Sequence, residues 1–208
     1  MKKQEIKTKA RGKIMSCSIH EMAYAIKALL EIYCDKKTPK VVKDEIKKSI
    51  HTLLSPDKWG GKNAVSEKAQ AFADERKFKT PLSEMSWRQL GHNKLKDKEK
   101  KDVNGTRGLI LEHIIPRHYI FDFLVASDRT IAEIEKIIDI TKCAVIDWKE
   151  DVKLNELGFA EERPDPKEAY GKAEIKLKDI KDMNDFINLS FFQSKLRIYD
   201  DGYLRSKN

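Results

Sequence analysis

The 208-residue sequence predicts an α+β protein in which a helical N-terminal region precedes a small core with two strands. Apolar residues recur at helical spacing up to about residue 90, whereas short β-type runs occur at 109–116 and 142–146. A lysine-rich polar stretch separates the two patterns. We therefore divide the chain into a basic arm at 1–13, a helical N-terminal region at 14–107, a core at 108–158 and a C-terminal extension at 159–208.

The helical N-terminal region is expected to hold four helices. The periodicity of apolar residues predicts the first two at 14–33 and 41–54, joined by a turn at Thr38-Pro39. An alanine-rich stretch predicts a third at 65–78. A Thr-Pro pair opens a short fourth helix at 80–90, which stops before a glycine.

Strands and helices alternate in the second half of the chain. The run LILEHIIP, residues 109–116, is a β-type segment ended by a proline, and KCAVI, residues 142–146, predicts a second strand. Asp147 and Glu150 have the spacing of a capping box, which predicts that a helix begins there and continues to about Leu157. The remaining expected elements are two helices at 119–126 and 130–138, a strand at 174–177 and a helix at 182–192.

The charge balance favours a polyanionic partner. Lys and Arg number 42 against 34 Asp and Glu, which gives a formal net charge of +8 and a sequence pI of about 9.2. Basic residues outnumber acidic ones in 35–48, whereas acidic ones dominate 147–168. No run approaches the length of a membrane span, and the start of the chain does not read as a signal peptide. Three widely spaced cysteines argue against a disulfide framework, so we expect a cytoplasmic protein.

Glu112 and His113 are the most informative residues of the sequence. Two ionisable side chains inside an apolar strand must find partners or take part in chemistry, because burying an unpaired charge is costly. The segment Glu112-His113-Ile114-Ile115-Pro116 resembles the HNH, or ββα-metal, endonuclease family, in which an acid or histidine, a histidine, two apolar residues and a proline close the first strand. The second strand and the helix that follows it extend this resemblance over residues 108–157.

The resemblance implies a role for each matching residue. Glu112 matches the first metal ligand, His113 matches the general base, and Asp151 falls where a residue of the helix completes the metal site. Asp147 and Glu150 are the alternatives to Asp151. The asparagine that braces the base histidine in the family has no clear counterpart here, and the connection at 117–141 is longer than usual, which implies an elaborated variant.

Residue chemistry is consistent with phosphodiester hydrolysis. Two carboxylates with water make a hard oxygen site suited to one Mg²⁺ or Mn²⁺ ion, and an imidazole can deprotonate an attacking water near neutral pH. The chain lacks a Cys-x-x-Cys pair, so no structural zinc is expected.

The sequence hence predicts a metal-dependent endonuclease that cleaves double-stranded DNA, in the manner of a restriction or defence enzyme. A palindromic target would imply a twofold homodimer. Two alternatives stay open at this point: a non-catalytic nucleic-acid-binding protein, and a nuclease toxin acting on RNA or without sequence preference. The residues expected to contact phosphates are Lys98, Lys100, Lys101, Arg107 and Arg117.

Overall fold

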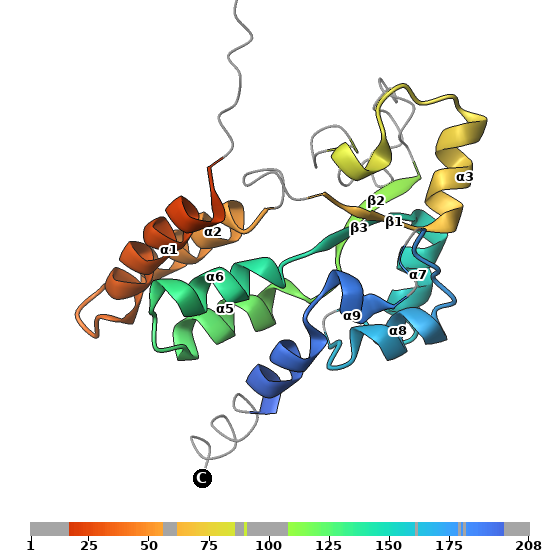
Figure 1. The fold of residues 1–208 in the computed structure, drawn as a ribbon. Helices are drawn as coiled ribbons and strands as arrows, with labels where there is room; N and C mark the ends of the chain where they lie inside the picture. Colours follow the sequence, from red (N-terminus) through yellow and green to blue (C-terminus); the bar gives the residue numbers. More distant parts are fainter. Residues whose placement is uncertain are drawn as a thin grey trace, which may run out of the picture.

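The computed structural model describes residues 17–55, 62–85, 90, 108–160, 162–178, 180 and 182–197, and they form an α+β fold (Figure 1). The basic arm, the 92–107 stretch and four of the predicted phosphate contacts lie outside these residues: Lys98, Lys100, Lys101 and Arg107. Within the described residues a small mixed sheet lies between a group of four helices and a second group of shorter helices.

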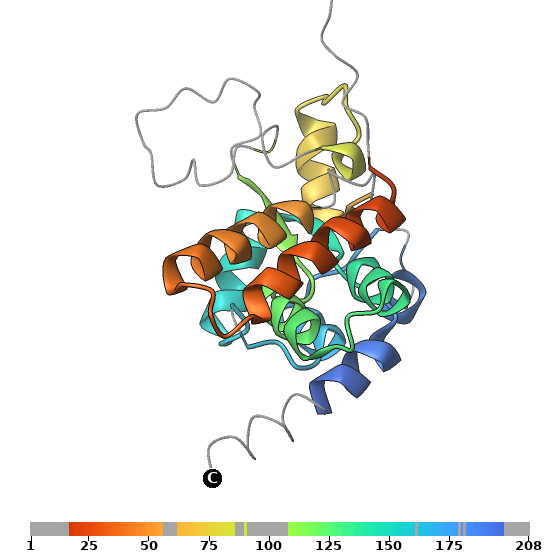
Figure 2. The same ribbon diagram turned by 90° about the vertical axis from the view of Figure 1, so that its left-hand side faces the viewer.

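Four helices pack together on one side of the sheet. They are α1 (Ile19–Cys34), α2 (Lys40–Leu53), α5 (Arg117–Ala126) and α6 (Ile131–Asp139), and Figure 2 shows α1 and α2 crossing in front of α5 and α6. Ser18 and Glu21 start α1 with a capping box, in which each side chain bonds the backbone of the other residue. The two helices of the 117–141 connection thus share one apolar core with the first two helices of the chain.

Three strands form the described sheet, in the order β1-β3-β2. Strand β2 (Leu109–His113) pairs antiparallel with β3 (Cys143–Asp147), so that His113 lies opposite Cys143. Strand β1 (Ala64–Val65) pairs parallel with β3. The prediction of a helix from Val65 was wrong at its start, because α3 (Glu67–Glu75) begins only after Ser66, whose hydroxyl caps it by accepting from the Ala69 N–H at 3.0 Å.

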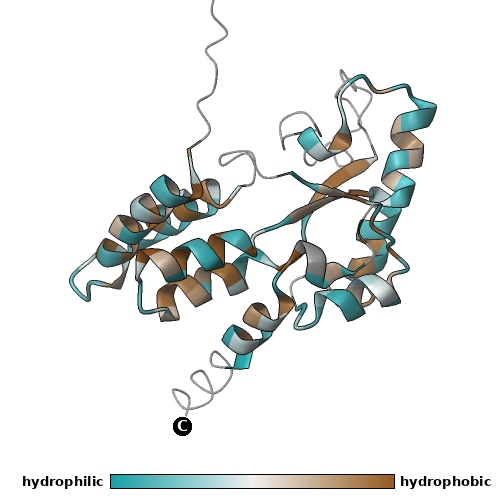
Figure 3. Cartoon of the chain, viewed as in Figure 1, coloured by the Kyte–Doolittle hydropathy of each residue, from teal (hydrophilic) through white to brown (hydrophobic). Residues whose placement is uncertain are grey.

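Each face of the sheet is covered by a different core. Leu109, Leu111, Cys143 and Val145 point toward α3 and belong to the smaller apolar cluster. The alternate residues of β2 and β3 belong to the larger cluster, which also contains Leu154 of α7 (Trp148–Glu156). Figure 3 shows the predominantly hydrophobic colour of β2. Helix α7 therefore lies on the face that carries Ile110 and Glu112.

Some predicted elements differ from the structure. The helix expected at 80–90 forms only in part among the described residues: there is a short 3-10 turn, η2 (Leu82–Glu84), Met85 is extended, and residue 90 is helical. The expected strand at 174–177 contributes a single bridge, between Ser66 and Leu177, because only Lys176 and Lys178 exchange backbone bonds with the β1 region.

The C-terminal extension is mostly helical. It contains α8 (Pro166–Lys172), α9 (Met183–Phe186) and a further helical stretch at 189–197, so the helix predicted at 182–192 is interrupted around residue 187. Within the residues described here, no helix is long and apolar enough to cross a membrane.

His51 in α2 makes the stability of the helical group depend on pH. Burial, Arg117 and Lys47 lower its pKa from 6.5 to about 4. The unfolded chain therefore takes up a proton near pH 6.5 that the folded chain refuses until about pH 4, so stability falls as the pH drops through this window. Because the ring is only half-buried, we expect a loss of about 1–2 kcal/mol. Urea unfolding at pH 7.5 and pH 5 should show this loss reduced in His51→Gln, and equal losses in both proteins would contradict the assignment.

Candidate active site

The candidate site is built on the end of strand β2. Glu112 lies on the α7 face of the sheet, and its Oε1 accepts a bond from Nη2 of Arg163 at 2.9 Å. The Arg163 side chain is 1% exposed and that of Glu112 is 22% exposed. The carboxylate is thus held at the boundary between core and solvent, with one oxygen engaged by a buried cation.

Arg163 uses its whole guanidinium group to join three segments. Beside Glu112, it donates to the carbonyls of His113 at 2.6 Å, Ile114 at 3.1 Å and Phe159 at 2.7 and 3.1 Å. The strand end, the carboxylate and the turn after α7 are therefore fixed to each other by one side chain. A guanidinium suits this role because its five N–H groups form a rigid planar fork.

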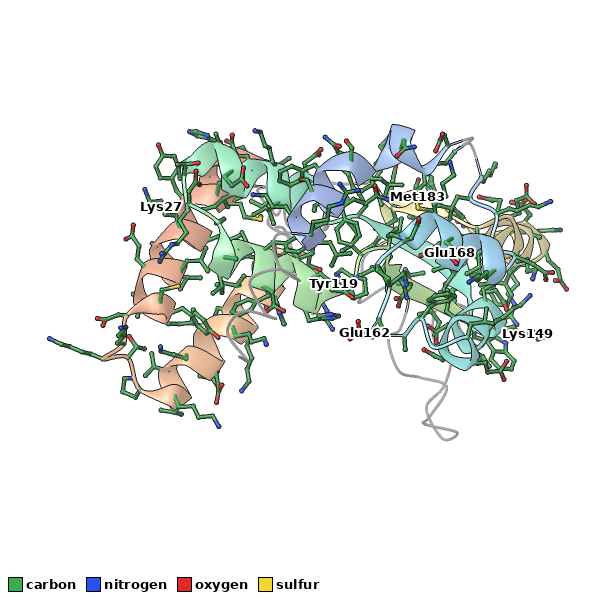
Figure 4. The ribbon with its side chains drawn as sticks, turned by 90° about the horizontal axis from the view of Figure 1, so that it is seen from below. Lys27, Tyr119, Lys149, Glu162, Glu168 and Met183 are labelled. Carbon is green, nitrogen blue, oxygen red and sulfur yellow. The ribbon has the colours of Figure 1, made fainter. Side chains whose placement is uncertain are left out.

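Aromatic residues surround this ion pair. The ring of Tyr170 in α8 is fully buried, with the guanidinium carbon of Arg163 5.8 Å from its centroid. Burial raises the pKa of the Tyr170 hydroxyl, so it stays neutral. Next to Arg163, Glu162 accepts from the hydroxyl of Tyr119 in α5 at 2.8 Å, and Figure 4 shows this pair near the middle of the molecule. The loop between α7 and α8 is thereby anchored to α5.

The charge of Asp151, in the first turns of α7, acts on Glu112. The pKa of Glu112 is raised, mainly because the carboxyl is buried; Arg163 opposes the increase, and the charge of Asp151 adds to it. Arg117, exposed at the first position of α5, also favours the ionised form of Glu112. Glu112 is therefore subject to the charges of Asp151, 39 positions later, and of Arg117, five positions later.

The two alternatives to Asp151 have structural roles. Asp147 is the N-cap of α7 and accepts from the Lys149 N–H at 2.8 Å. Glu150 is 2% exposed; its Oε2 accepts from the Asp147 N–H at 2.9 Å and from the Ser66 hydroxyl at 2.6 Å. The predicted capping box is confirmed, and both carboxylates are committed to starting α7 and tying it to β1.

His113 projects toward the opposite face from Glu112, since neighbouring strand residues alternate. It is 7% exposed and follows Leu109 and Leu111 in register, on the α3 side. Strand β2 is at the edge of the described sheet. The side chains of Glu112 and His113 could reach the same phosphate only if that phosphate crossed the edge of β2. The role of His113 as general base stays a prediction.

The donor set bears on which metal could bind. No cluster of three or more His, Cys, Asp or Glu side chains that could hold a metal occurs among the described residues. Mg²⁺ usually keeps several waters and binds through one or two carboxylates plus substrate phosphates. Glu112 and Asp151 supply that number of carboxylates, and Arg163 engages only one oxygen of Glu112.

Sequence reasoning missed Arg163, Ser66 and Tyr170. Arg163 stands in a loop among other charged residues, and its partners at the end of β2 and just after it are 49 to 51 positions away. Only the buried carboxylate of Glu112, which needs a cation as its partner, pointed to such a residue.

No known protein family matches the chain, and neither a curated protein nor a solved structure matches it.

Proposed function

We propose that this protein is a metal-dependent endonuclease of the cytoplasm that hydrolyses phosphodiester bonds in double-stranded DNA. One observation supports it most: two carboxylates, Glu112 at the end of β2 and Asp151 in the helix that directly follows β3, act on each other on one face of an antiparallel strand pair. This is the strand, strand and helix order in which the resembled family carries its metal ligands. A restriction or defence role, with a homodimer on a palindromic site, is the form that we favour.

Each residue of the candidate site has a separate role in the proposed reaction. Glu112 and Asp151 would hold a divalent cation, which when bound supplies charge neutralisation for the scissile phosphate and the leaving oxygen. Arg163 holds Glu112 in place through the 2.9 Å bond. Arg117, exposed beside the site, attracts the phosphate. His113 would accept the proton of the attacking water across the edge of β2.

A cleavage assay with two matched variants tests the proposal. Purified protein is incubated with supercoiled plasmid and Mg²⁺ or Mn²⁺, with and without chelator. We expect nicking that chelator abolishes and that Asp151→Asn lowers by roughly two orders of magnitude or more, because a metal ligand is lost. Glu156→Gln, an exposed residue of the same helix, removes the same charge and should leave cleavage unchanged.

Metal binding gives the same test a second readout. Mn²⁺ titration followed by electron paramagnetic resonance should show weaker binding in Asp151→Asn and unchanged binding in Glu156→Gln. Because the pKa of Glu112 is raised, protons should begin to displace the metal at a higher pH than an ordinary glutamate would allow. Cleavage that persists in chelator, or that is equal in both variants, would overturn the proposal.

The ion pair of Glu112 with Arg163 favours a second candidate, a nucleic-acid-binding protein without catalysis. In that case Glu112 serves only to neutralise the buried guanidinium of Arg163, whose Nη2 lies 2.9 Å from Oε1 of Glu112. Tight, salt-dependent DNA binding with no cleavage of DNA or RNA under any metal would select this candidate. Cleavage of RNA alone would instead select a ribonuclease.

A further inference from the structure

Basic side chains of α2 lie over aromatic rings of α1 and α5. The Lys43 ammonium lies 5.7 Å from the centroid of the Tyr33 ring, and that of Lys47 lies 4.8 Å from the centroid of Phe121. The two rings contact each other edge to face, with centroids 5.0 Å apart. Cation–π contacts of this kind hold the long lysine side chains in place without neutralising their charge.

Arg117 continues this arrangement toward the candidate active site. Lys43 and Lys47 are one turn apart on α2, about 6 Å along its axis, and Arg117 is one turn before Phe121 on α5. We call Lys43, Lys47 and Arg117 the cationic stripe. None of the three forms an ion pair with a carboxylate in the described part of the chain.

Neighbouring residues locate the Arg117 end of the cationic stripe. Arg117 and Lys47 both lower the pKa of His51. The centroid of the His51 ring lies 5.6 Å from that of Phe121, so both charges lie near this pair of rings. Arg117 is the first residue of α5 and follows Glu112 by five positions, just after the end of β2, which brings that end of the stripe to the candidate active site.

The other end of the stripe is less positive. Burial raises the pKa of Tyr33, and the charges of Asp122 and Asp44 add to this increase. The Lys43 ammonium lies over the same ring. Two acidic side chains therefore lie near the Lys43 end of the stripe.

We propose that the cationic stripe binds successive backbone phosphates of the DNA duplex that flank the cleaved bond. This inference rests on the proposed function, because the bound strand is the one that the Glu112 site would cut. An extended row of positioned cations fits a polyanion that presents charge along its length, and such contacts set orientation rather than sequence preference. Figure 1 shows α2 and α5 on the same side of the sheet.

The test measures DNA affinity against salt, in chelator so that no cleavage occurs. If Lys43 and Lys47 each neutralise one phosphate, the double variant Lys43→Gln/Lys47→Gln should reduce the slope of log K against log salt by about 1.8, for any DNA sequence. Lys43→Arg/Lys47→Arg keeps both charges and should keep the wild-type slope. The control Lys149→Gln/Lys176→Gln removes two exposed charges from the α7 and α8 side, where Figure 4 labels Lys149.

The outcomes separate this inference from the proposed function. A wild-type slope in Lys43→Gln/Lys47→Gln, or an equal reduction in the control pair, would overturn the stripe even if Asp151-dependent cleavage occurs. A slope reduced only in the stripe variant would support the stripe, and it would do so even if no metal produced cleavage. Circular dichroism of each variant checks that the helices remain folded.

Discussion

Replacing His113 with alanine is expected to lower the rate of metal-dependent DNA cleavage by roughly two to four orders of magnitude, because a general base is lost. DNA affinity in chelator should stay the same, since the imidazole is only 7% exposed and so offers little surface to a phosphate. The measurement is single-turnover cleavage of a saturated complex, which separates chemistry from binding.

Two controls distinguish a base from a packing residue. His118→Ala removes an imidazole five residues further on, whose ring centroid lies 4.1 Å from that of Tyr119 with the planes tilted by 39°, and it should cleave at the wild-type rate. Added imidazole should partly restore cleavage by His113→Ala but not by Asp151→Asn, because only the first lacks a proton acceptor. Near-normal cleavage by a folded His113→Ala protein would refute the assignment and would leave the base to be sought on the Glu112 face of the sheet.

The elements predicted well are those with local signals. Asp147 and Glu150 are three residues apart, and the capping box that they predicted starts α7 where expected. The two β-type runs became β2 and β3, because β-branched residues in short apolar segments fit a buried sheet. Capping and strand propensity depend on residues within one turn or one strand, which the sequence displays directly.

The features that sequence reasoning missed depend on distant partners. Strand β1 is two residues long and exists because β3 offers it a parallel edge some 80 positions later. Ser66 reads as an ordinary helix cap, yet its hydroxyl also bonds Glu150 across 84 positions. Glu150 could therefore be proposed as a metal ligand from its position in the helix, whereas its burial against Ser66 depends on the tertiary fold.

The candidate site, like the fold, was predicted only in part. Glu112 was identified because a carboxylate in an apolar strand needs a partner, and it has one in Arg163. The identity of that partner followed from no pattern, since Arg163 is in a loop. Strand alternation was available from the sequence, and it places the side chains of Glu112 and His113 on opposite faces. If Glu112 and His113 act on one phosphate, that alternation and the strand order require the phosphate to cross the edge of β2.

Replacing Arg163 with methionine is expected to lower the free energy of unfolding by about 3–5 kcal/mol, because it leaves Glu112 buried without its counter-charge. Three backbone carbonyls would also lose their donor, at the end of β2 and after α7. Urea unfolding at pH 7.5 measures the loss. The double variant Arg163→Met/Glu112→Gln should be more stable than the single one, since it buries no uncompensated charge.

The pH dependence of Arg163→Met separates the charge effect from the lost hydrogen bonds. Arg163 opposes the increase in the pKa of Glu112, so without it that pKa rises further above the unfolded value of 4.5. A group whose pKa is raised by folding loses stability as the pH increases through the folded pKa, so Arg163→Met should regain stability as the pH falls from 7.5 toward 5. The double variant, which lacks the carboxylate, should show no such recovery. Equal pH profiles for both variants, or a loss below about 1 kcal/mol in the single variant, would mean that Glu112 is solvated rather than held by Arg163.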